Sequence, residues 1–145
     1  MSAVTATISS PDFDASSFVV DSIVVHERVG ALFEVDVVAT TMDSVGLRPG
    51  MRVTVRVRED RPAPSASRSF TGMVIDGEHT VPPEPNTPRQ LRFQVRPEAY
   101  RLALVRTQEV FVDHTVLEVL EEKLVRVGLA GVASFSVSEL FPPRN

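Results

Sequence analysis

The residues that could support acid–base chemistry occur in three adjacent pairs: His26-Glu27, Asp113-His114 and Glu121-Glu122. A histidine beside a carboxylate can act as a general base when a further group orients it. The sequence offers no such third group, and neighbouring residues on a helix do not face each other. Asp113 also precedes an expected helix, where the helix dipole favours a carboxylate. We therefore expect no catalytic residues and no enzymatic activity.

The potential metal ligands are equally sparse. The chain has no cysteine, and its three histidines, His26, His79 and His114, lie far apart in the sequence. Zinc sites instead use short and regular ligand spacings. The glycine-rich and acidic loops that bind nucleotides or calcium ions are missing from the sequence as well. We expect no metal, no cofactor and no small-molecule substrate.

Arginine is the residue type whose placement indicates a binding surface. Five arginines share the polar faces of two alternating segments: Arg52, Arg56, Arg58, Arg92 and Arg96. A basic strand face can bind nucleic acid, but such faces usually carry aromatic residues for base stacking. These faces carry none, and the net charge is -4, so nucleic acid is a weak candidate partner. The arginines are expected to line a lumen or an interface, or to pair across strands with Glu34 and Asp36.

The arginines lie in segments whose apolar and polar residues alternate. This alternation is clearest at 32–37, 51–58 and 89–96, and it is typical of half-buried antiparallel strands. The expected inward side chains are Phe33, Val35, Val37, Met51, Val53, Val55, Val57, Leu91, Phe93 and Val95. Less regular strands are expected at 18–25 and 69–79.

The breaks between strands contain glycine and proline. Proline-rich loops at 59–67 and 80–88 separate three of the strands, because proline cannot continue a sheet ladder. Gly72 and Gly77 mark expected bulges or bends, and a last strand is expected at 132–137. Five or six antiparallel strands usually close into a barrel or a sandwich to protect their edges.

One helix is expected at about 115–127. Thr115 and Glu118 have the spacing of a capping box, and Gly128 stands where a helix often ends. An apolar stripe should pack this helix on the core: Leu117, Leu120, Leu124 and Val127. The fold class is therefore mainly β, an antiparallel β-barrel with one α-helix.

The length of the chain and its N-terminal sequence limit the number of domains and the location of the protein. A chain of 145 residues fits a single domain, 1–145, of which residues 1–15 are expected to be flexible. Residues 1–10 lack the basic start and apolar run of a signal peptide, and no stretch is long enough to span a membrane. We expect a cytoplasmic protein that does not insert into membranes.

Several landmarks along the chain occur in the order found in a known family. They are Phe18, Glu27, Leu32–Val35, Leu47–Val55, Phe70–Val74, Val95–Glu98, Leu102, Leu104, a strand at Arg106–Phe111 and a helix at Thr115–Leu120. Together they resemble the N-terminal hub region of VgrG spike proteins of type VI secretion systems. That region is similar to the tail-hub protein of contractile phages.

The resemblance implies a barrel of the tail-tube type, several copies of which form a ring without catalytic residues. The chain would then be a structural subunit of a contractile injection apparatus, which forms or joins that ring. Its partners would be itself or other hub, tube and baseplate proteins, in a particle that can be exported. The alternative is a monomeric β-barrel adaptor that binds a peptide or nucleic acid through the arginine-rich strand faces.

The C-terminal sequence departs from the family. In the family, a Tyr-Pro-x-Arg-like segment leads into a second ring-forming domain and a needle. Here the sequence reads Phe141-Pro142-Pro143-Arg144-Asn145. We therefore expect a stand-alone hub-like barrel, a split gene product or part of a longer spike, rather than a complete spike.

Overall fold

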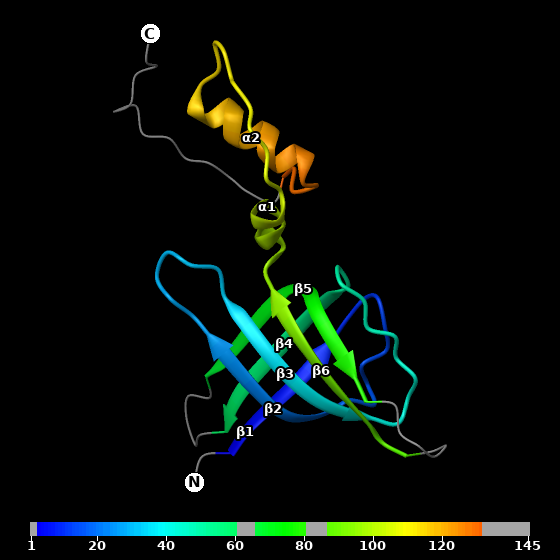
Figure 1. Cartoon of the computed structure of the whole chain (residues 1–145). Helices are drawn as coiled ribbons and strands as arrows, with labels where there is room; N and C mark the ends of the chain where they lie inside the picture. The colour runs from blue at the N-terminus through cyan, green and yellow to red at the C-terminus, as the bar shows by residue number, and fades with distance from the viewer. Residues whose placement is uncertain (1–2, 61–65, 81–86, 132–145) are drawn as a thin grey trace. The chain divides into compact units, whose positions relative to one another are not determined.

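The computed structural model describes residues 3–60, 66–80 and 87–131 (Figure 1). The chain divides into two compact units, residues 1–97 and residues 98–145. The first unit holds the strands and the second holds the helices, so each is described by itself. The expectation of a single domain over 1–145 stays a prediction.

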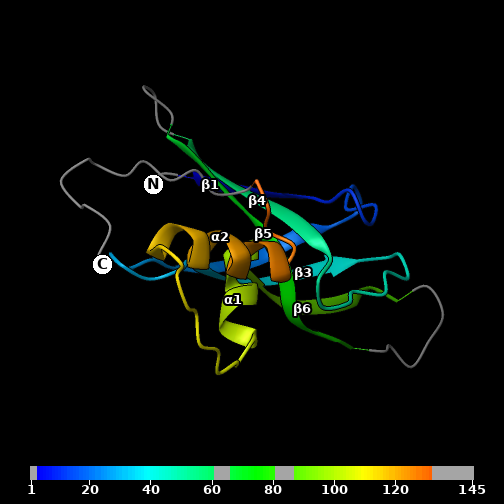
Figure 2. The ribbon, with the colours of Figure 1, turned by 90° about the horizontal axis from the view of Figure 1, so that it is seen from above.

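The first unit is a nearly closed barrel made from one six-stranded sheet. Its strands are β1 (Ala3–Ser9), β2 (Val19–His26), β3 (Glu34–Thr41), β4 (Arg52–Asp60), β5 (Ser67–His79) and β6 (Arg89–Arg96). They are ordered β1-β4-β5-β6-β3-β2, and every neighbouring pair is antiparallel. The two edge strands, β1 and β2, approach each other and bring the sheet round (Figure 2). The predicted antiparallel β-barrel is confirmed.

The alternating segments form strands close to where the sequence placed them. β4 and β6 coincide with the segments 51–58 and 89–96 to within two residues, and β3 begins two residues later than expected. β1 was not predicted: it lies within the segment expected to be flexible, yet it pairs with β4 from Ala3↔Asp60 to Ser9↔Thr54. The strand expected at 132–137 lies outside the described residues.

The barrel interior is filled by the residues that the alternation assigned to it. Seven of the ten buried core residues were among the predicted inward side chains: Val35, Val37, Val53, Val55, Leu91, Phe93 and Val95. The predicted Phe33, Met51 and Val57 are partly buried and pack against this cluster. Ala39, Phe70 and Val74 complete it. The period-two pattern therefore identified the core of the first unit.

A glycine in β5 permits a close approach of two strands. A Cβ atom on Gly72 would lie 2.1 Å from the backbone oxygen of Arg96, closer than any real contact. The register between β5 and β6 then shifts between Val74 and Asp76. The expected irregularity is present, and it falls between Gly72 and Gly77 rather than on either glycine.

The second unit contains a 3-10 turn (Glu98–Tyr100), a short helix α1 (Arg101–Leu104) and a longer helix α2 (Val116–Arg126). The predicted capping box of α2 is confirmed, because Thr115 and Glu118 bind each other's backbone N–H groups. Gly128, just after the helix, has a φ of 74°. Residues 105–111 are irregular, so the strand that the resemblance implied there is wrong.

The second unit does not itself bury the apolar stripe of α2, and the packing of this helix on the barrel core stays a prediction. None of its residues is buried, and Leu120 is 43% exposed. An apolar stripe on a helix shows which face is suited to burial, but it does not show that a partner covers that face. None of the helices in the described ranges is long and apolar enough to cross a membrane.

Candidate functional site

The five arginines singled out in the sequence all point away from the barrel interior. Arg52, Arg56 and Arg58 come from β4, whereas Arg92 and Arg96 come from β6. β5 lies between these two strands in the sheet. The structure therefore divides the arginines into two groups with different surroundings. Their role in a lumen or an interface stays a prediction.

Two members of the β4 group lie beside hydroxyl groups, whereas Arg52 lies opposite Met73 and donates its backbone N–H to the Asp12 carboxylate. In the sheet register, Arg56 lies between Thr7 of β1 and Ser69 of β5, and Arg58 lies between Thr5 and Ser67. The Arg56 Nε atom donates a hydrogen bond of 3.4 Å to the Ser69 hydroxyl. Short hydroxyl side chains leave the long arginines prominent on this part of the barrel.

The β6 group lies among carboxylates. Arg96 forms an ion pair with Glu34 of the neighbouring strand β3. Gln94, on the same strand as Arg96, donates hydrogen bonds from its side-chain amide to Glu34 at 2.9 Å and to Asp36 at 3.1 Å. The predicted cross-strand pairing is thus confirmed for Arg96 with Glu34. Asp36 instead contacts Gln94, and its carboxylate lies 3.6 Å from the Nε2 atom of His26.

A second ion pair lies near the start of β5. Arg68 binds the Glu27 carboxylate through two contacts, of 2.6 and 2.7 Å, and lies 5.3 Å from the ring centre of Phe70. Glu27 directly follows β2, which is not a sheet neighbour of β5, so the pair bridges separate strands. The sequence pointed to Glu27 only as a landmark and as half of the His26-Glu27 pair, and it did not point to Arg68. The arginine stands beside Ser67 and Ser69, outside any alternating run.

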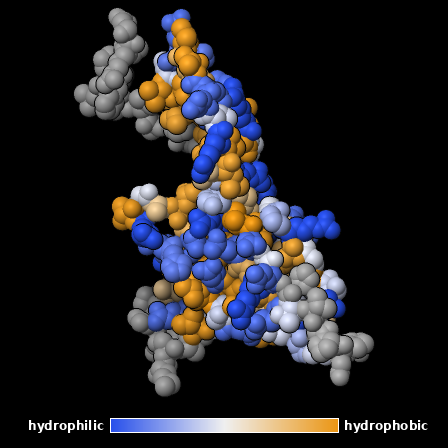
Figure 3. Space-filling view, in the orientation of Figure 1, coloured by the Kyte–Doolittle hydropathy of each residue, from blue (hydrophilic) through white to orange (hydrophobic). Residues whose placement is uncertain are grey.

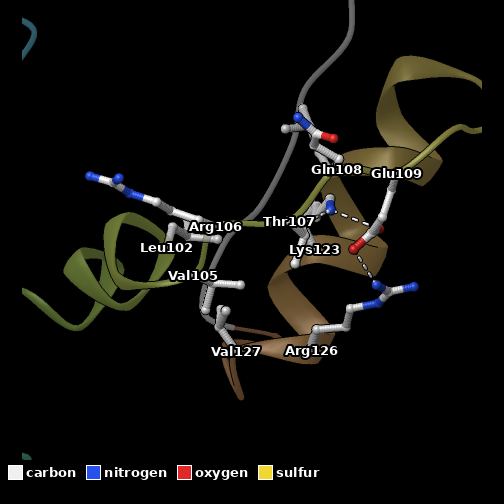
Figure 4. Close-up of a pocket in the computed structure, with 10 residues that line it drawn as sticks. Leu102, Val105, Arg106, Thr107, Gln108, Glu109, Lys123, Arg126 and Val127 are labelled. Carbon is white, nitrogen blue, oxygen red and sulfur yellow. Dashed lines mark hydrogen bonds and ion pairs between the residues drawn. The ribbon is translucent and has the colours of Figure 1, made fainter.

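A groove of about 580 Å³ lies in the second unit, between the segment after α1 and helix α2 (Figure 4). Glu109 lies there with two cations: its carboxylate is 2.7 Å from the Lys123 Nζ atom and 2.6 Å from an Arg126 guanidinium nitrogen. The hydrogen bond from Lys123 holds the pKa of Glu109 below its usual value. These three charged groups bind one another, which does not favour the groove as a site for a charged substrate.

The titratable pairs considered for catalysis do not converge. The His114 Nδ1 atom donates a hydrogen bond of 2.7 Å to the backbone oxygen of Val112. Asp113 has a φ of 57°, a conformation that aspartate tolerates better than most residues. The side chain of His79 lies outside the described part. No three histidine, cysteine or acidic side chains gather into a metal site within the described ranges.

The fold and the surface together define the class of protein: an antiparallel β-barrel that carries its charged side chains on the outside. The sequence matches the family described as phage tail baseplate hub (GPD) over residues 26–145. Because this match covers most of the chain, the chain belongs to that family. A comparison with curated proteins found no match.

Family membership bears on several expectations drawn from the sequence. The resemblance to a phage hub is confirmed. A baseplate hub family indicates a structural role in a tail hub, together with assembly with other tail or baseplate proteins. It also favours a protein that is not an enzyme.

Proposed function

We propose that this chain is a structural subunit of a contractile injection apparatus, either a type VI secretion spike or a phage-like tail hub. In this role its barrel forms or joins a ring of barrels. The observation that carries the proposal is the match to the baseplate hub family over residues 26–145, which includes four of the six strands, β3 to β6. The VgrG-like landmarks support the type VI version of the proposal.

The surface of the barrel suits assembly. Its core residues are enclosed, and alternate residues of β4 and β6 project polar side chains outward, most of them long. A ring subunit must present two faces to its neighbours and one to a wet lumen, and these strands supply such faces. Arg52, Arg56, Arg58, Arg92 and Arg96 are the residues proposed to line that lumen or an interface. The subunit would fold in the cytoplasm and then join a particle, with or without export.

The experiment is to follow the tagged chain through particle assembly in its native cell. Deletion of its gene should abolish tube-bearing particles, and the wild-type chain should restore them and sediment with them. The tube protein that co-purifies with the chain then separates a secretion system from a phage-like particle. Arg28→Glu/Arg48→Glu, which alters two exposed loop arginines, serves as a control and should restore assembly as well.

The adaptor function predicts different results. A chain that never sediments with tube or baseplate proteins, and whose deletion leaves particles intact, would refute the structural role. Tight binding of a single-stranded oligonucleotide, lost in Arg56→Glu/Arg58→Glu, would then support the adaptor.

A further inference from the structure

The second unit leaves much of its apolar surface exposed. Among the described residues, fourteen large hydrophobic side chains are exposed, and eight of them belong to residues 102–125. Figure 3 shows hydrophobic side chains on the surface of this unit around α2. Apolar side chains gathered in this way mark a surface where another segment of the chain or a partner binds.

The groove beside α2 contains part of this apolar surface. Three of its four charged lining residues bind one another, because Glu109 pairs with both Lys123 and Arg126. The side chain of the fourth, Arg106, extends away from them (Figure 4). An occupant should therefore be apolar and uncharged, since an added charge would lose its water without gaining a partner. The aliphatic side chains that would meet it are Leu102, Val105, Leu120 and Val127.

The sequence after Gly131 supplies a segment with these properties. Residues 132–138, which lie outside the described residues, read Val-Ala-Ser-Phe-Ser-Val-Ser and contain no charged residue. Ala133, Phe135 and Val137 alternate with three serines. This alternation is typical of an extended segment with one apolar and one polar side. The segment therefore matches the groove in its chemistry.

The end of α2 brings this segment to the groove. The Leu129 N–H donates a hydrogen bond of 2.8 Å to the Leu124 carbonyl group, as in a Schellman motif, and Leu129 is 1% exposed. The turn after the helix is therefore packed within the unit. Val127 lines the groove, and Val132 follows it by only five positions.

The segment is also long enough to cover the groove. The lining positions on α2 and its C-cap extend from 120 to 127, which is about 11 Å at about 1.5 Å per residue. Six extended residues, 132–137, reach about 20 Å at about 3.3 Å per residue. They can therefore run along the whole groove.

We infer that residues 132–137 of the same chain cover this groove in an extended conformation, with Ala133, Phe135 and Val137 against its aliphatic lining. The serines between them face solvent. A tethered segment competes at a roughly millimolar effective concentration, which favours it over a second copy or a separate protein. The inference concerns the second unit alone, so its failure would leave the proposed role of the barrel unaffected.

The accessibility of a cysteine in the groove tests this cover. The chain has no cysteine, so one introduced thiol reports on one position. Val105→Cys lies in the groove, and Val110→Cys, on the same segment but 90% exposed, is the matched control. Val105 is itself 49% exposed, so without a cover the two thiols should react at similar rates. In the full chain, a maleimide should label Val105→Cys at least about tenfold more slowly than Val110→Cys.

Substitutions in the segment identify what covers the groove. Adding Phe135→Ser/Val137→Ser should restore rapid labelling of Val105→Cys, because this change removes the apolar side of the segment. Adding Ser134→Ala/Ser136→Ala changes the opposite side and should leave the labelling slow. Circular dichroism verifies that each variant keeps its helix and sheet content.

A proximity measurement tests the same contact without those substitutions. In Val105→Cys/Ala133→Cys, a short bifunctional maleimide should join the two cysteines within one chain. In Val110→Cys/Ala133→Cys, the same crosslink should form at least about tenfold more slowly, because the effective concentration of the two thiols is lower. Electrophoresis under denaturing conditions separates crosslinks within a chain from crosslinks between chains.

The inference is overturned if Val105→Cys is labelled as rapidly as Val110→Cys. Protection that persists in folded Phe135→Ser/Val137→Ser would also overturn it, because something other than this segment would then cover the groove. Protection that disappears on dilution, with crosslinks between chains, would overturn it in favour of a second copy. Protection at every concentration, with crosslinks within one chain, is the expected result.

Discussion

The barrel and the C-terminal unit differ in what becomes of their apolar side chains. The barrel encloses ten buried residues in one cluster, drawn from four strands. In the described part of the second unit, Leu129 is the buried hydrophobic residue, and helix α2 has no buried residue at all. Both units nevertheless show clear apolar patterns in the sequence.

The difference arises because the apolar residues of a strand and those of a helix need different packing surfaces. A strand in a barrel lies beside strands of the same sheet, whose inward residues necessarily share one interior. An amphipathic helix must instead meet a separate surface, and its own sequence does not specify that surface. Period-two alternation therefore predicts burial more directly than a helical stripe does.

The largest expected effect on stability comes from replacing one leucine with alanine in each of the two units. Leu91 is 1% exposed in β6, and Leu120 is 43% exposed in α2. Leu91→Ala should lower the free energy of unfolding by about 2–5 kcal/mol, because it leaves a cavity in a closed core. Leu120→Ala should lower it by about 1 kcal/mol or less, as expected for a partly exposed site. Guanidinium denaturation followed by circular dichroism measures both values.

Equal losses for the two leucines would contradict this comparison. They would mean that Leu120 is covered in solution as thoroughly as Leu91. The sequence-based expectation that α2 packs on the core would then be supported.

A smaller loss of stability is expected from adding one methyl group inside the barrel. Gly72→Ala would bring the new Cβ atom against the Arg96 carbonyl group and push β5 away from β6, at a cost of about 1–3 kcal/mol. Gly46→Ala is the matched control, because nothing lies within 4 Å of its Cβ position and its φ is not positive. The unfolding midpoint should fall for Gly72→Ala and stay near wild type for Gly46→Ala. A folded Gly72→Ala protein of unchanged stability would show that the two strands have room to separate.

The sequence predicted the parts of the molecule that depend on local pattern. Strands β3, β4 and β6, their inward residues and the Thr115–Glu118 capping box all follow from spacing within a few residues. Strand β1 was missed because its alternating small residues, such as Thr5 and Thr7, carry little hydrophobic contrast.

The surface arrangement could not be predicted because it depends on strand order. β4 and β6 have similar alternating arginines, yet only the sheet order places Arg96 beside Glu34 and Arg56 between hydroxyls. The contact between Glu27 and Arg68 likewise joins residues 41 positions apart that no local pattern connects. The different surroundings of the β4 and β6 arginines therefore become visible only in the folded barrel.

The smallest expected effect is a pH dependence confined to the second unit. Hydrogen bonds from the Thr115 backbone and hydroxyl hold the pKa of Glu118 below its ordinary value of 4.5. Because this pKa is lowered in the folded state, the contribution to helix stability is complete above pH 4.5 and is lost as the pH falls through the lowered pKa. Amide exchange in the first turn of α2 should therefore accelerate in acid relative to amides of β6. Glu118→Gln retains a capping partner for Thr115 but cannot titrate, so its first turn should lack this acid-induced loss. The same loss in Glu118→Gln would assign it to another group in the unit, with Glu109 as the next candidate because its pKa is also lowered.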